Sequence, residues 1–111
     1  MSDFNAKSIL ETEIPALLAS KPEIRKEIDA VVHFQVSGEG GGTWTVDLTK
    51  SSDWVVAGAH GTPKMTISVS NDDFVKLRRR QLNPQMAALQ GKLKFRPMDM
   101  ALAMKLGKLF G

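Results

Sequence analysis

Few side chains in this sequence are of a type that carries out catalysis or binds metals. The 111 residues include two histidines, His33 and His60, but no cysteine and no tyrosine, which excludes disulfides, thiolate zinc sites and thiol nucleophiles. Neither histidine has a second ligand at metal spacing or a nucleophile beside it, so we interpret both as solvated or hydrogen-bonded side chains. Asp47 and Asp53 flank a polar turn, where aspartate commonly makes local hydrogen bonds. The sequence therefore predicts no metal site, no cofactor and no enzyme activity.

A glycine-rich segment, residues 38–42, has the composition of a phosphate-binding loop. It lacks the Lys-Ser/Thr pair that follows such a loop, and it leads into a predicted strand rather than a helix. The segment therefore predicts the loop of a β-hairpin.

The last predicted helix, residues 98–110, is apolar on nearly every face. After the capping Asp99, only Lys105 and Lys108 are charged, whereas a surface helix normally has a broad polar face. The protein's own core, a partner subunit or an apolar ligand between helices and sheet would each cover this surplus. Methionine either fills gaps in a small core or adapts to ligands of varied shape, and four of the six lie near this helix, namely Met86, Met98, Met100 and Met104.

Positive charge is concentrated in the second half of the chain. Residues 1–55 contain five Lys or Arg and nine Asp or Glu, whereas residues 56–111 contain ten and three. This imbalance indicates either a solvated basic face or an anionic partner. Aromatic residues are not interleaved with the basic cluster at residues 76–80, so we expect no nucleic acid partner and favour transient contact with an anionic membrane surface.

Apolar periodicity and capping residues predict the elements that position these segments. Pro15 either kinks the first helix or divides it in two. Ser20, Ser70, Asn83 and Asp99 are the predicted helix caps. The expected helices cover residues 5–19, 20–28, 71–80, 84–90 and 99–110, and the expected strands cover residues 30–37, 43–48, 54–59, 64–70 and 92–96.

This order of elements predicts one α+β domain over residues 1–111. The first four strands follow one another along the chain and are expected to form an antiparallel meander. We expect a five-stranded, mainly antiparallel sheet with about five helices packed on one face.

Several segments of the sequence match a known family in order and spacing. They are Ser70-Asn71-Asp72-Asp73-Phe74, Leu82-Asn83-Pro84-Gln85-Met86-Ala87, Gln90-Gly91-Lys92-Leu93-Lys94 and Leu102-Ala103-Met104-Lys105-Leu106. Together they resemble the sterol carrier protein 2 family. Residues 31–38 and 44–48 are similar to that family's first two strands, so the resemblance covers about residues 8–110.

The resemblance implies a hydrophobic tunnel between the sheet and the helices. Such a tunnel would hold a fatty acid, fatty acyl-CoA, sterol or phospholipid, and the implied function is non-enzymatic lipid binding and transfer. Carried over by position, the tunnel lining includes Ala88, Leu89, Met100, Ala101 and Met104. Strand and helix parity adds Phe34, Trp44, Val46, Phe74 and Leu77.

The sequence also departs from the family pattern. Met98-Asp99 replaces a common Gly-Asn pair, and Ala101 replaces a frequent glycine, so the larger side chains are expected either to narrow the tunnel mouth or to change which lipid fits. The chain ends in Leu109-Phe110-Gly111 instead of a Ser-Lys-Leu-like tripeptide, and it has no apolar leader or membrane-spanning run. We therefore expect a cytoplasmic protein.

A second class of function stays open from the sequence alone. The apolar face of the last helix also suits an interaction or accessory module of lipid or quinone metabolism, in which a partner protein or second copy covers that face.

Overall fold

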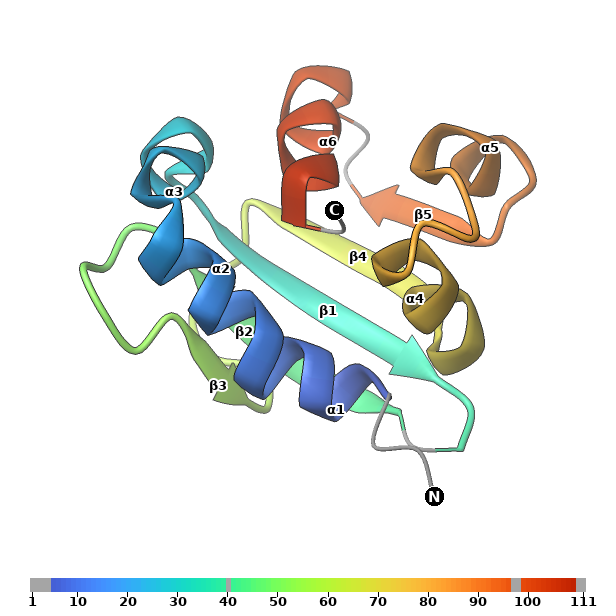
Figure 1. Ribbon diagram of the computed structural model, residues 1–111, viewed down its shortest axis with the longest axis horizontal. Helices are drawn as coiled ribbons and strands as arrows, with labels where there is room; N and C mark the ends of the chain where they lie inside the picture. The colour runs from blue at the N-terminus through green and yellow to red at the C-terminus, as the bar shows by residue number, and fades with distance from the viewer. Residues whose placement is uncertain (1–4, 40, 97–98, 110–111) are drawn as a thin grey trace.

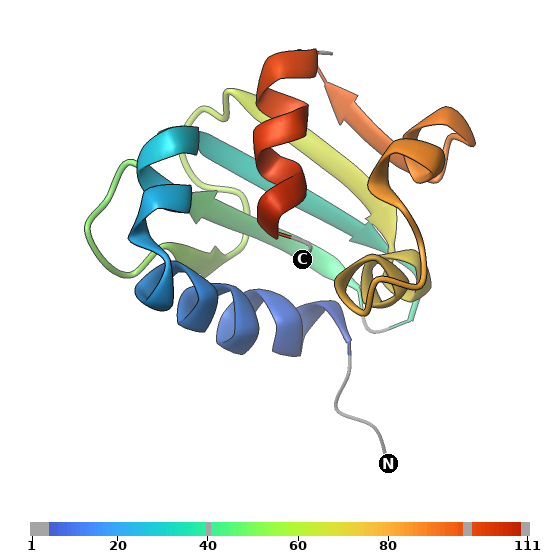
Figure 2. The ribbon, with the colours of Figure 1, turned by 45° about the horizontal axis from the view of Figure 1, so that its top comes forward.

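Five strands form one mixed sheet, and the helices cover one of its faces (Figures 1 and 2). The computed structural model describes residues 5–39, 41–96 and 99–109, without the side chains of Met100 and Leu109. The strand order is β3-β2-β1-β4-β5. The strands are β1 (Val31–Ser37), β2 (Gly42–Asp47), β3 (Val55–Ala57), β4 (Met65–Ser70) and β5 (Leu93–Arg96). The predicted α+β class, with a mainly antiparallel sheet, is confirmed.

The predicted meander is correct for the first three strands and wrong for the fourth. Phe34 pairs with Trp44 in the antiparallel β1–β2 ladder, and β3 adds antiparallel to β2. β4, however, lies parallel to β1, with Phe34 beside Ile67. Alternating apolar residues define the buried face of β4, but they do not say which strand it pairs with.

A loop that crosses the open face of the sheet accounts for this topology. The N–H of Gly58 donates to the carbonyl of Thr43 at 2.8 Å, and the N–H of Lys64 donates to the carbonyl of Val31 at 2.7 Å. Between these points the Thr45 hydroxyl donates to the Gly58 carbonyl at 2.7 Å. The chain therefore passes across β2 and β1 and enters the sheet on the far side of β1.

The first helical segment is continuous and contains one widened turn. α1 (Ala6–Ser8) runs into a π-helical turn, η1 (Ile9–Glu13), and then into α2 (Ile14–Ser20). In that turn the N–H of Ile14 donates to the carbonyl of Ile9, five residues earlier. Pro15 has no N–H and its ring crowds the preceding turn, so widening lets the helix continue without a break. Of the two predicted alternatives, the structure has one helical segment.

Three of the four predicted caps are confirmed. Ser70 begins α4 (Asn71–Arg78), Asn83 begins α5 (Pro84–Leu89) and Asp99 begins α6 (Met100–Leu106), each by accepting a backbone N–H with its side chain. α6 continues as a 3-10 turn, η2 (Gly107–Leu109). Ser20 does not cap α3 (Pro22–Ile28), because it is the last residue of α2 and its hydroxyl donates to the carbonyl of Leu17.

The core lies between the sheet and the helices. Phe34 of β1 and Phe74 of α4 are stacked there, with ring centroids 5.6 Å apart and planes at 18°. Trp44 is buried beside them on β2, and its indole N–H donates to the carboxylate of Glu11 at 2.8 Å. This bond ties the π-helical turn to the sheet and satisfies the indole nitrogen.

Candidate binding site

An apolar pocket of about 670 Å³ opens between α5, α6 and β5. Figure 2 shows α5 and α6 standing apart above the edge of the sheet, with β5 between them. The pocket is lined by Asn83, Pro84, Gln85, Ala88, Leu89, Phe95, Ala103, Met104 and Gly107.

The placement of α5 exposes its apolar side chains to this pocket. Asn83 caps the helix, accepting the N–H of Gln85 at 2.8 Å, and Pro84 occupies the first helical turn. Ala87 is fully buried against the core, so its neighbours Ala88 and Leu89 face the pocket instead. Leu89 is 82% exposed.

α6 forms the opposite wall in the same manner. Leu102 and Leu106, one turn apart, are buried in the core. Ala103, Met104 and Gly107 are therefore turned toward the pocket, and Met104 is 65% exposed. The space exists because small residues, Ala88 on one wall and Ala103 and Gly107 on the other, leave it unfilled. The floor is Phe95 of β5.

The structure separates the predicted lining residues into groups. Ala88, Leu89 and Met104 meet in the pocket. Ala101 is exposed on α6 and does not line the pocket. The side chain of Met100 lies outside the described part of the structure, and so do residues 97–98, which include the departure from the family pattern at Met98. Buried in the core are Phe34, Trp44, Val46, Phe74 and Leu77, of which Leu77 also lines a second hollow described below. Among the described residues the hollow is an open pocket, and a tunnel reaching those core residues stays a prediction.

Sequence reasoning missed most of the small and polar lining. Phe95 alternates with Leu93 on β5, so parity alone places it on the helix-covered side. Ala103 adjoins the predicted Met104, but its small side chain adds little to an apolar pattern, so the sequence does not indicate it as lining. The sequence indicates Asn83, Pro84 and Gln85 as a helix start and as part of the family resemblance, but not as pocket lining.

A second, more polar hollow of about 470 Å³ adjoins the pocket. It shares Asn83, Pro84 and Gly107 with the apolar pocket, so these three residues lie between the two hollows. Its other lining residues are Leu77, Arg80, Gln81 and Leu82. The first hollow is thus lined mainly by apolar side chains such as Leu89 and Met104, whereas the second also has Arg80 and Gln81 in its lining.

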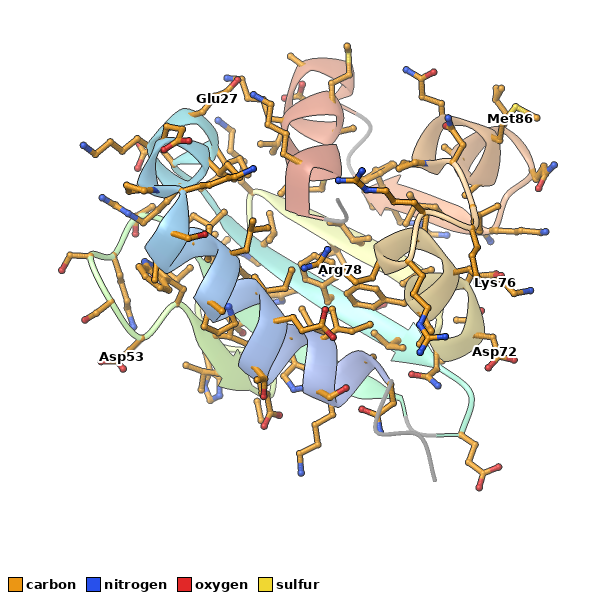
Figure 3. The ribbon with its side chains drawn as sticks, viewed as in Figure 1. Glu27, Asp53, Asp72, Lys76, Arg78 and Met86 are labelled. Carbon is orange, nitrogen blue, oxygen red and sulfur yellow. The ribbon has the colours of Figure 1, made fainter. Side chains whose placement is uncertain are left out.

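Two ion pairs hold helices that border this region. Lys108 Nζ lies 2.5 Å from Glu27 Oε2, which joins η2, the 3-10 turn that continues α6, to α3. The hydrogen bond from Lys108, supported by the positive charges of Lys108 and Lys105, lowers the pKa of Glu27 although desolvation opposes the shift. Arg78 lies in the middle of the helical layer, between α2 and α4 (Figure 3), with its Nε 3.2 Å from Glu13 Oε1.

Both histidines make local structural contacts. The Nε2 of His33 lies 2.9 Å from the carbonyl of His60, and the Nε2 of His60 lies 2.9 Å from the carbonyl of Ala57. No group of three His, Cys, Asp or Glu side chains that could hold a metal occurs in residues 5–39, 41–96 and 99–109. None of the helices in these ranges is both long and apolar enough to cross a membrane.

Known protein sequences are similar to this chain over most of its length. The model of the SCP-2 sterol transfer family matches residues 12–111. Hydroxysteroid dehydrogenase-like protein 2 of Bos taurus is 43% identical over 91 residues, covering 78% of this chain and 21% of that protein. Peroxisomal multifunctional enzyme A of Dictyostelium discoideum is 37% identical over 108 residues, covering 96% of this chain and 24% of that protein. The chain thus spans about a quarter or less of the length of these relatives.

Solved structures share the whole architecture. Palmitated SCP2L2 of Aedes aegypti is 25% identical, with a TM-score of 0.75 over 96% of this chain and 94% of that one. The sterol carrier protein domain 2 of Helicoverpa armigera is 26% identical, with a TM-score of 0.74 over 99% of this chain and 92% of that one. The first of these proteins is palmitated in its structure.

Proposed function

This chain belongs to the SCP-2 sterol transfer family, and we propose that it binds the acyl chain of a lipid in the pocket between α5 and α6 and transfers it without catalysis. The observation that supports this most directly is the open pocket of about 670 Å³ with Leu89 and Met104 exposed at its rim. Pockets for small ligands commonly measure about 300–1,000 Å³. The free protein leaves apolar surface in water that an acyl chain would cover.

The energetics of this site suit a carrier. Moving an acyl chain from water into an apolar pocket is worth about 0.8 kcal/mol per methylene. Association entropy offsets about 4–15 kcal/mol of that gain, and a lipid taken from a bilayer has already left water. The net free energy of extraction is therefore near balance, so the protein can release what it binds.

The structural relatives support the same ligand class. The Aedes aegypti relative with palmitate has this architecture over nearly its whole length. We propose a fatty acyl chain as the ligand of this protein on that ground, together with the shape of its own pocket.

Binding of a fluorescent fatty acid tests the proposal directly. Titration with cis-parinaric acid should give saturable binding at one site, and native mass spectrometry of the purified protein should detect co-purified lipid. Ala103→Phe places a ring in the pocket and should weaken this binding about tenfold or more, because the acyl chain and the ring compete for the same space.

A matched variant controls for the added ring. Ala16 is exposed on α2, away from the pocket lining, so Ala16→Phe should leave the affinity unchanged. Absence of saturable binding to the wild-type protein, or equal loss in both variants, would overturn the proposed site.

The length of the curated relatives favours a second candidate function. This domain corresponds to about a fifth of a dehydrogenase-like protein. The same pocket would then present a lipid to a catalytic domain, as an accessory module. Addition of such a partner enzyme to lipid-loaded protein would raise the rate of lipid turnover in this case, whereas a simple carrier would leave that rate unchanged.

A further inference from the structure

We propose that the edge of the sheet formed by β5, with α5 beside it, docks on the surface of an anionic membrane. The partner is a bilayer that contains acidic phospholipids, contacted by cationic side chains of β5 and apolar side chains of α5. This inference goes beyond the proposed function, because it concerns where the protein meets a membrane rather than how it holds a lipid. Vesicle binding and fatty acid binding are measured separately, so either can fail alone.

β5 has positive side chains on the face of the sheet opposite the helices. Lys94 and Arg96 alternate along the strand with the buried Leu93 and Phe95, so the two cations point away from the core. Both are exposed, and so is Lys92, which precedes the strand. In the described part of the chain no hydrogen bond or ion pair engages any of these three cationic groups. They are therefore free to interact with an anion outside the protein.

The elements around β5 add no negative charge to this edge. In the β4–β5 ladder Lys94 lies beside Ser68, and Arg96 lies beside Thr66. β1, β4, β5 and α5 contain no Asp or Glu. An anionic surface at this edge would therefore meet cations and hydroxyl groups, without a carboxylate from the same elements to repel it.

Apolar side chains are exposed on α5, which packs against β5. Leu89, the last residue of α5, is largely exposed, and Met86, one turn earlier, is about half exposed. The turn between the two elements is short, and the N–H of Lys92 donates to the carbonyl of Ala87 at 2.8 Å. Figure 1 shows α5 beside β5 at the edge of the sheet opposite β3, and Figure 3 shows Met86 pointing outward there. Cationic and apolar side chains thus occur together at one edge of the molecule.

This combination of side chains suits a bilayer surface better than other partners. At a membrane interface, Lys and Arg reach the lipid phosphates while neighbouring apolar side chains enter the boundary of the acyl region. Lysine on an edge strand also discourages pairing with another protein chain, but that role does not explain exposed apolar side chains beside it. Single-stranded nucleic acid is bound by exposed aromatic side chains, and Phe95, the aromatic residue of α5 and β5, is buried.

The proposed docking edge adjoins the candidate pocket. Leu89 of α5 and Phe95 of β5 both line that pocket. A membrane at this edge would therefore lie next to the space in which we propose that the acyl chain binds, which shortens the path of a lipid between the bilayer and the protein.

Co-sedimentation with vesicles tests this surface. Wild-type protein should bind vesicles of phosphatidylcholine and phosphatidylglycerol about tenfold or more tightly than vesicles of phosphatidylcholine alone, and high salt should weaken this binding. Lys94→Glu/Arg96→Glu reverses two charges and should weaken binding to the mixed vesicles about tenfold or more. Neither residue lines the pocket, so the affinity of this double variant for cis-parinaric acid should stay unchanged. Its melting temperature checks that it is folded.

Matched variants separate this edge from the net charge and hydrophobicity of the whole protein. Lys7 on α1 and Lys50 in the turn after β2 are exposed, and Lys7→Glu/Lys50→Glu changes the net charge equally but should leave vesicle binding nearly unchanged. Met86→Ser should weaken vesicle binding about two- to fivefold, because apolar area that enters the interface is lost. Val56, exposed on β3 at the opposite edge, provides the control, and Val56→Ser should not weaken it.

Three results would overturn the inference. Equal binding of the wild-type protein to charged and neutral vesicles would show that the cations of β5 do not direct docking. Equal loss of binding in the two double variants would assign the attraction to net charge rather than to this edge. Absence of vesicle binding would remove the membrane as partner, and binding of a single-stranded oligonucleotide that Lys94→Glu/Arg96→Glu abolishes would then assign the edge to nucleic acid. The acyl-chain site would stand in each case, because fatty acid titration tests it independently.

Discussion

The carboxylate of Glu27 on α3 accepts a hydrogen bond of 2.5 Å from Lys108, at the end of the last helix. These residues are 81 positions apart in the chain, and α3 and α6 are in contact. In Figure 3 Glu27 lies beside the upper part of α6. The pair thus links the end of the α6 segment, which forms one wall of the candidate pocket, to α3 on the other side of the helical layer.

This ion pair predicts a small, acid-sensitive part of the protein's stability. The pKa of Glu27 is lowered in the folded state, chiefly by the hydrogen bond from Lys108, from an ordinary value of 4.5. A lowered folded pKa means that the contribution is fully present above the unfolded pKa and is lost as the pH falls through the folded value. Glu27→Gln should therefore lower the melting temperature slightly at pH 7, and the difference from wild type should shrink as the pH falls from 7 to 3.

Thermal denaturation from pH 3 to pH 7 measures this difference. Because both side chains are largely in solvent, added salt should also reduce it. A difference that stays constant down to pH 3 would show that the substitution acts through something other than the charge of Glu27.

Thr45 holds the crossing loop that the sequence did not predict. Its hydroxyl donates to the Gly58 carbonyl and accepts the N–H of His60 at 2.8 Å, and its side chain is buried. Thr45→Val keeps the shape of the residue but removes both bonds, so it should reduce the free energy of unfolding by about 1–3 kcal/mol. Urea denaturation measures this loss, and Thr43→Val, on the same strand at a partly exposed position, should cost less.

Leu77 tests whether the buried side chains predicted as tunnel lining act as core or as ligand contacts. It is 1% exposed, on the inner face of α4. As a core residue, Leu77→Ala should reduce the free energy of unfolding by about 2–5 kcal/mol. The affinity of the remaining folded protein for cis-parinaric acid should change less than in Ala103→Phe. A large loss of affinity with little loss of stability would instead support a ligand that reaches into the core.

Local patterns predicted the elements of this fold, and their partners in space were harder to predict. Alternation placed Phe34 and Trp44 on the buried face, and Ser70, Asn83 and Asp99 cap helices as expected, because these signals act within a few residues. The parallel pairing of β4 with β1 depends on a loop crossing the sheet, and alternation has no information on that path.

The pocket was only partly predictable for a related reason. The apolar surplus of the last helix and the exposed Met104 agree with the expectation of uncovered apolar surface there. The hollow itself results from small residues, Ala88, Ala103 and Gly107, that face one another across two helices. Small residues add little to a hydrophobicity pattern, so the position of empty space emerges only from the packed structure.

A substitution at Leu89 is expected to change ligand affinity while leaving the stability of the protein nearly unchanged. It is 82% exposed in the free protein and lines the pocket, so Leu89→Ser removes little buried area and should leave the melting temperature nearly unchanged. If a lipid chain covers this side chain, the same substitution should weaken binding about three- to tenfold, since the buried apolar contact is lost. Fluorescence titration with cis-parinaric acid measures the affinity.

Met86 provides the matched control for that variant. It lies on the same helix, is 49% exposed and points outward from α5 (Figure 3), and it does not line the pocket. Met86→Ser should therefore leave affinity for the fatty acid unchanged. Equal weakening in the two variants would mean that the ligand covers the outer surface of α5 rather than the pocket, because only Leu89 of the two lines the space between the helices.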